Sequence, residues 1–91
     1  MAALDKIATG QVTITTAATQ IVAARKERDG VELSKLGSQN LFLGCSTVTA
    51  ATGHLFAGTC GTTKIYPTSD AIYGITASGE EVVSFLEIYP R

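Results

Sequence analysis

The sequence predicts an all-β fold, a small single-domain β-sandwich with a jelly-roll-like arrangement. Short runs rich in Thr, Val and Ile recur between about residues 10 and 89, and several alternate polar with apolar residues, which is typical of half-buried strands. Turn-forming dipeptides such as Asp29-Gly30 and Ser78-Gly79 separate these runs. About seven short strands with such turns favour two facing sheets, with an open barrel as the alternative.

Each expected strand is justified by its own side-chain pattern. In the first run, Val12 and Ile14 share one face. The run at 41–45 is almost continuously apolar, which is typical of a central strand that is covered on both faces. A later run stops at Pro67, which has no N–H to donate to a ladder. The expected strands cover residues 11–15, 20–24, 31–35, 41–45, 62–66, 71–75 and 81–89.

The first nine residues differ from the rest of the chain. Leu4, Ile7 and Ala8 have the i, i+3, i+4 spacing of a helical face. So short a segment does not hold a helix alone, so we expect either a frayed tail or an arm that becomes ordered on a partner. The chain is therefore divided into an N-terminal arm, residues 1–9, and a β-sandwich domain, residues 10–91.

Two further segments lack a strand pattern. The dense charge run at 25–30 is expected to be a solvated hairpin tip, with a charged partner contact as the alternative. Small residues dominate 46–61, where we expect Leu55 and Phe56 to plug the core from a long loop.

The last expected strand points to an interface. Val83 and Phe85 lie on one of its faces, while Val82 and Leu86 lie on the other. A strand with two apolar faces needs a cover on both, and in so small a domain the second cover is expected from another subunit. Together with two residues of the arm, the outer pair forms the predicted interface: Leu4, Ile7, Val82 and Leu86.

Composition narrows the function. The net charge is −1 and charged residues make up 16% of the chain, whereas about 25% is usual in soluble domains. Such a balance argues against nucleic acid as a partner and is consistent with a surface that a protein partner covers. No apolar stretch approaches the roughly 20 residues of a membrane helix, and the N-terminus does not resemble a signal peptide, so synthesis in a cytoplasm is expected.

Reactive residues are few. Cys45 and Cys60 are expected to be small, partly buried side chains, and the sequence leaves open whether they are bridged. His54, the only histidine, is expected at the surface or in a hydrogen bond, and with Cys45 it makes a weak case for an enzyme. No catalytic residue, metal ligand or cofactor site is predicted.

Several segments carry a resemblance to small structural proteins of tailed bacteriophages. The likeness lies in QVTITTAATQIV, NLFLG, VTAATG, AIYGITASG and VSFLE, and it extends over most of residues 10–87. The resemblance implies a compact β domain of the virion, commonly a trimer. Cys45, Cys60 and the charge run at 25–30 depart from that pattern.

The first functional hypothesis is therefore a capsid decoration (cement) protein. It would bind the major capsid protein on the outer surface of the shell, as a homotrimer, and stabilise the lattice. A head-fibre protein, or a tail-fibre or baseplate module, is the structural alternative. A carbohydrate-binding sandwich that uses Tyr66, Tyr73 and Tyr89 is the alternative from another class.

Overall fold

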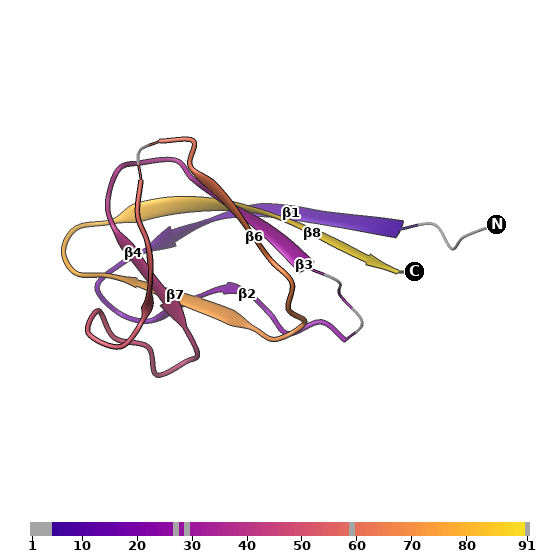
Figure 1. Ribbon diagram of the computed structural model, residues 1–91, viewed down its shortest axis with the longest axis horizontal. Helices are drawn as coiled ribbons and strands as arrows, with labels where there is room; N and C mark the ends of the chain where they lie inside the picture. The colour runs from indigo at the N-terminus through magenta and orange to yellow at the C-terminus, as the bar shows by residue number, and fades with distance from the viewer. Residues whose placement is uncertain (1–4, 27, 29, 59, 91) are drawn as a thin grey trace.

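The predicted fold class is confirmed, because the chain forms a β-sandwich of two four-stranded antiparallel sheets (Figure 1). The computed structural model describes residues 5–26, 28, 30–58 and 60–90. Sheet A has the order β1-β8-β3-β6 and sheet B the order β2-β7-β4-β5. The strands are β1 (Asp5–Ile14), β2 (Thr19–Val22), β3 (Gly30–Lys35), β4 (Leu41–Gly44), β5 (His54–Phe56), β6 (Thr63–Tyr66), β7 (Ile72–Thr76) and β8 (Glu81–Pro90).

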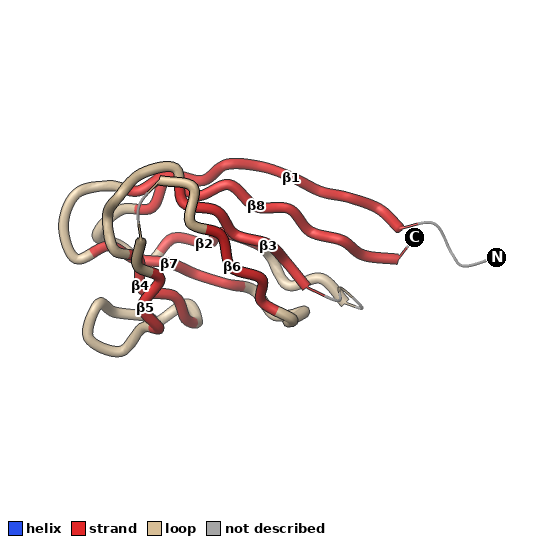
Figure 2. Tube along the Cα trace, turned by 45° about the horizontal axis from the view of Figure 1, so that its top comes forward, coloured by secondary structure: helices blue, strands red, loops and turns tan. Residues whose placement is uncertain are grey.

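The strand order is that of a jelly roll. β1 pairs with β8, β2 with β7, β3 with β6 and β4 with β5, as in one long hairpin whose two arms are folded over together. Two further pairings, β3 with β8 and β4 with β7, join these strand pairs into the two four-stranded sheets. Figure 2 shows the result as two layers, with β1, β8 and β3 side by side in one of them.

The core lies between the two inner faces. Because side chains alternate along a strand, β3 sends Val31 and Leu33 inward while the residues between them face out. The buried apolar cluster consists of Ile14, Ile21, Val22, Val31, Leu33, Leu41, Leu43, Phe56, Ile72 and Val83.

Three expectations about local structure are wrong. Residues 5–9 form no helical turn, because β1 begins at Asp5 and pairs with β8 without a break through Gly10; residues 1–4 lie outside the described part. An eighth strand, β5, lies within the segment expected to be a loop, since it pairs with β4. On β5, Phe56 fills the core as expected, but Leu55 points outward and is 49% exposed.

The charge run at 25–30 is not simply a solvated tip. The Arg28 side chain is fully buried, and its Nη1 lies 2.8 Å from Oε2 of Glu87. Its guanidinium also donates to the carbonyl oxygens of Ala23 (3.0 Å), Thr68 (2.9 Å) and Asp70 (2.6 Å). Arg28 therefore ties the β2–β3 and β6–β7 loops to β8.

A second buried pair lies at the opposite end of β8. Glu81 is only 2% exposed, and its Oε1 lies 3.9 Å from Nζ of the buried Lys35. Lys35 also donates to the carbonyl oxygen of Gly58 at 3.0 Å. Both ends of β8 are thus held by charged side chains inside the sandwich.

Candidate functional site

The candidate site is the outer face of sheet A, the face directed away from sheet B. Strand register arranges its side chains in rows across the sheet. One row runs from Thr9 through Leu86 and Glu32 to Ile65. Neighbouring residues in a row have Cβ atoms about 5 Å apart, so each row acts as a continuous strip of surface.

One end of this face is apolar. Ile7 is directly opposite Ile88 in the register, and they are 65% and 44% exposed; Ile65 is 70% exposed. Ile65, Leu86 and Ile88 line one shallow hollow of about 300 Å³. We call Ile7, Ile65, Leu86 and Ile88 the isoleucine patch. Three large aliphatic side chains that remain in water on one face indicate an interaction surface.

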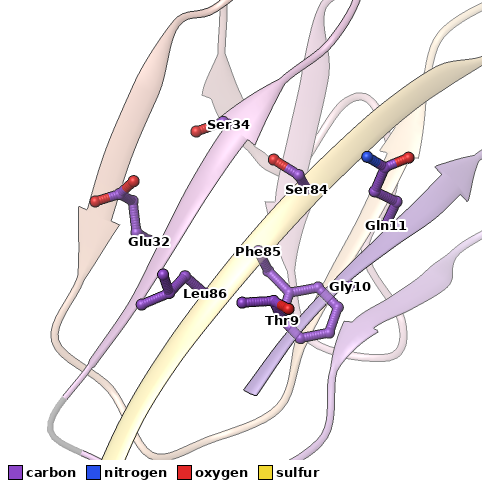
Figure 3. Close-up of a pocket in the computed structure, with 8 residues that line it drawn as sticks. All are labelled: Thr9, Gly10, Gln11, Glu32, Ser34, Ser84, Phe85 and Leu86. Carbon is purple, nitrogen blue, oxygen red and sulfur yellow. The ribbon is translucent and has the colours of Figure 1, made fainter. Parts of the chain in front are cut away.

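The middle of the face is polar. A second hollow of about 440 Å³ adjoins the patch at Leu86, and the side chains around it come from β1, β3 and β8 (Figure 3). On the β6 side of this hollow, the Ser34 Oγ lies 2.8 Å from the Thr63 Oγ1. We call this the polar hollow. Its lining residues are Thr9, Gly10, Gln11, Glu32, Ser34, Ser84, Phe85 and Leu86.

The Phe85 ring lies against Gly10 of β1 beside the hollow. A Cβ atom at Gly10 would lie 2.8 Å from the Phe85 ring, so the ring takes the space that a side chain would fill. The β1–β8 register runs without a shift from Asp5–Pro90 to Ile14–Glu81. Because no bulge reverses the alternation, the odd-numbered residues of β1 from Ile7 to Thr13 all face outward.

The polar hollow can bind but has little means to catalyse. Among the described residues, Glu32 is the only ionisable side chain that lines it, beside hydroxyl and amide groups. Hydroxyls and amides both donate and accept hydrogen bonds, which suits contact with polypeptide main chain or polar side chains. A hydroxyl nucleophile would need a neighbouring base, and a single exposed carboxylate on this flat face is a weak one.

The structure places three of the four predicted interface residues on this face. Ile7 and Leu86 belong to the isoleucine patch, and Val82 lies on the same face, half-buried opposite Thr13. Leu4 lies outside the described residues.

Two residues of the patch were missed. Ile65 and Ile88 alternate with the inward residues of their strands, so the period-two pattern that predicted Val82 and Leu86 also contains the signal for them.

Tyr66 and Tyr73, two of the three tyrosines of the predicted carbohydrate site, do not form one stacking surface. Tyr66, on β6, packs edge-on against Phe56 with ring centroids 6.5 Å apart, and burial raises its pKa. Tyr73, on β7 of the other sheet, donates its hydroxyl to Oε1 of Gln20 at 3.0 Å. The side chain of Tyr89 lies outside the described part.

The cysteines differ from expectation. Cys45 and Cys60 are exposed rather than partly buried, and both are free thiols. The Cys45 Sγ lies 3.1 Å from Oγ1 of Thr47, and this hydrogen bond lowers the pKa of the thiol. His54 is an exposed residue of β5. The described residues contain no group of three or more His, Cys, Asp or Glu that could hold a metal ion.

Comparison of the chain with protein-family models, with curated proteins and with solved structures finds no match. In the part of the chain that the structure describes, no helix has the length and apolar character to cross a membrane.

Proposed function

We propose that this protein is a capsid decoration protein of a tailed bacteriophage, which docks on the shell through the outer face of sheet A. The observation that carries the docking surface is the isoleucine patch: Ile7, Ile65 and Ile88 lie on one face and remain 44–70% exposed. The virion context rests on the sequence resemblance. The partner is the major capsid protein, and the trimer remains an implication of that resemblance.

Burial of the patch supplies the attraction. Complete burial of an isoleucine side chain contributes about 1.5–3 kcal/mol, so the three isoleucines, at 44–70% exposure, offer roughly 3–5 kcal/mol once their present partial burial is discounted. This gross energy must also offset the entropy lost on association. A single copy therefore binds modestly, and repetition over a lattice increases the total.

The polar hollow supplies specificity beside the patch. Thr9, Gln11 and Ser84 present hydroxyl and amide groups that can pair with polar atoms of a shell subunit. A partner that left these groups unpaired on docking would lose their hydration without compensation. The face therefore selects a partner with both an apolar area and matching polar atoms.

Stabilisation of the shell follows from mass action. A ligand that binds the assembled lattice but not its separate subunits favours the assembled state by RT ln(1 + [L]/Kd) for each site. No chemical step is required, and this matches a surface of aliphatic, hydroxyl and amide groups.

Quantitative mass spectrometry of purified virus particles tests this function. A copy number in fixed, near-lattice proportion to the major shell protein is the expected result. A trace amount would assign the chain to the tail or a fibre instead. Complete absence from particles would refute the virion function, and saturable binding of glycans by the free protein would then favour the carbohydrate-binding alternative.

A further inference from the structure

The four outer strands of the two sheets are protected to different degrees. β2 and β5 have only four and three residues, and the β2 pairing shifts register between Gln20 and Val22. β6 has four residues, carries Lys64, and is followed by Pro67. Short length, bulges, lysine and proline are the usual means by which proteins prevent an edge from pairing with another chain.

β1 has charged residues only at its N-terminal end, Asp5 and Lys6, and none of these protections from Ile7 to Ile14. It is ten residues long, pairs with β8 without a register shift, and has no proline. From Ile7 to Ile14 it has no charged residue. Among the described residues no strand pairs with its other side, since β1 is the outer strand of sheet A. A long, regular edge that is uncharged over Ile7–Ile14 is a template for strand addition.

The ladder shows which main-chain groups of β1 face this edge. The Leu36 N–H donates to the Val82 carbonyl oxygen at 2.9 Å, so the main chain of Val82 faces β3. Alternate residues of an inner antiparallel strand face opposite neighbours, so the odd-numbered residues of β8 face β1. Their partners in β1 are even-numbered. The N–H and C=O groups of the odd-numbered residues of β1 therefore point to the free edge of sheet A. In the uncharged segment, these residues are Ile7, Thr9, Gln11 and Thr13.

We propose that this edge pairs with β1 of a second copy of the chain, antiparallel, about a two-fold axis at Gly10. An antiparallel strand is complementary to its own two-fold copy, so each residue pair occurs twice. No like charges meet along Ile7–Ile14, because that segment has none. The two A sheets then form one continuous eight-stranded sheet.

The register follows from which residues face the edge. Only residues whose N–H and C=O groups point to the free edge can exchange hydrogen bonds with the second copy. Odd-numbered residues must therefore oppose odd-numbered residues. Of these registers, only the one with its two-fold axis at Gly10 uses the edge-facing N–H and C=O groups of all four odd-numbered residues from Ile7 to Thr13. Ile7 then opposes the partner's Thr13 and Thr9 opposes the partner's Gln11. Four pairs that exchange two bonds each give about eight bonds, close to the roughly ten of a typical interface.

The area argues for a weak, concentration-dependent dimer. A single strand edge buries less than the roughly 800 Å² per partner of a standard interface. This contact is isologous and has a two-fold axis, so it is separate from the three-fold contact that the resemblance implies. It also does not depend on the proposed docking to a shell.

Charge placed at Thr9 and Gln11 tests both the contact and its register. Thr9→Lys/Gln11→Lys puts two like-charge pairs across the axis, whereas Thr9→Lys/Gln11→Glu puts two opposite-charge pairs there. Thr9→Glu/Gln11→Glu repeats the like-charge case with the opposite net charge. Both positions are exposed, so the fold should tolerate all three variants, which circular dichroism checks.

Sedimentation equilibrium of the full chain up to high micromolar concentration gives the readout. We expect a monomer–dimer equilibrium for the wild type, dimerisation of the Lys/Glu variant at least as tight, and a Kd for both like-charge variants roughly tenfold larger or more. A wild type that stays monomeric would overturn the proposal. So would a trimer that responds to none of the variants, or equal dimerisation of the Lys/Lys and Lys/Glu variants.

Discussion

Replacement of Arg28 tests the account of how charged residues hold this small sandwich together. The Arg28→Met variant keeps an unbranched apolar side chain about as long as the aliphatic part of arginine, but it removes the guanidinium. It leaves the Glu87 carboxylate, whose side chain is only 6% exposed, still paired with the half-exposed Arg25 but without its buried partner. It also removes the donors to three loop carbonyl oxygens.

The expected loss is large for a domain of this size. Removal of one partner from a buried ion pair costs about 3–5 kcal/mol, because it leaves an uncompensated charge. At roughly 0.05–0.15 kcal/mol per residue, the whole domain has about 5–14 kcal/mol of stability. Arg28→Met should therefore remove about a fifth of it or more.

Arg25 supplies the matched control. It also bonds Oε2 of Glu87, at 3.1 Å, but its side chain is 39% exposed. Solvent weakens such a pair to about 0–1 kcal/mol, so Arg25→Met should have a small effect. The double variant Arg28→Met/Glu87→Leu removes both buried charges and should recover part of the loss, because the loop carbonyls stay unpaired.

Urea unfolding followed by circular dichroism measures all these variants. The expected order of unfolding free energy is wild type, Arg25→Met, the double variant, and then Arg28→Met, with unchanged m-values. If Arg28→Met cost no more than Arg25→Met, the reasoning about the buried pair would be refuted.

The titration of Glu87, the reactivity of Cys45 and the Lys35–Glu81 pair supply three further tests. Burial acts to raise the pKa of Glu87, but the bonds from Arg28 and Arg25 outweigh it and lower the pKa below its ordinary 4.5. The stability from these bonds is therefore complete above about pH 4.5 and lost as the pH falls through the folded-state pKa, and Glu87→Gln should flatten that decline in acid unfolding curves. Cys45, with its lowered pKa, should react faster than Cys60 with a thiol reagent at neutral pH in the native protein, as tested with the Cys45→Ser and Cys60→Ser variants; equal rates would contradict this. Lys35→Met should cost about 3 kcal/mol in urea unfolding and Lys35→Met/Glu81→Gln less, whereas an equal loss would show that the pair is not coupled.

Local patterns predicted the fold because most strands have their own period-two alternation. Val12 with Ile14, for example, marks the inner face of β1 regardless of its neighbours. Helical spacing misled at residues 5–9, since β8, whose paired residues lie 77 to 85 positions away, pairs with this segment and determines its conformation. β5 was missed because three residues are too few to show a period.

The buried charges could not be predicted either, because their partners are distant in the sequence. Arg28 meets Glu87 and Lys35 meets Glu81 only after the jelly roll closes, and each residue alone resembles an ordinary surface residue in the sequence.

The candidate site was partly visible. The two apolar faces of the last strand predicted Val82 and Leu86, but Ile65 joins them only through β3, which separates β6 from β8 in the sheet. The composition shows only that the chain has few charged residues, which is compatible with a surface that a partner covers.

The most direct test of the docking face is co-sedimentation of the protein with particles that lack it. Ile88→Ser and Ile65→Ser change the isoleucine patch, while Leu55→Ser, at 49% exposure on β5, removes a similar exposed side chain from sheet B. All three should fold as the wild type does, since none of these residues belongs to the buried core. We predict that the two patch variants bind at least tenfold more weakly and that Leu55→Ser binds like the wild type. Full binding by both patch variants would contradict the account.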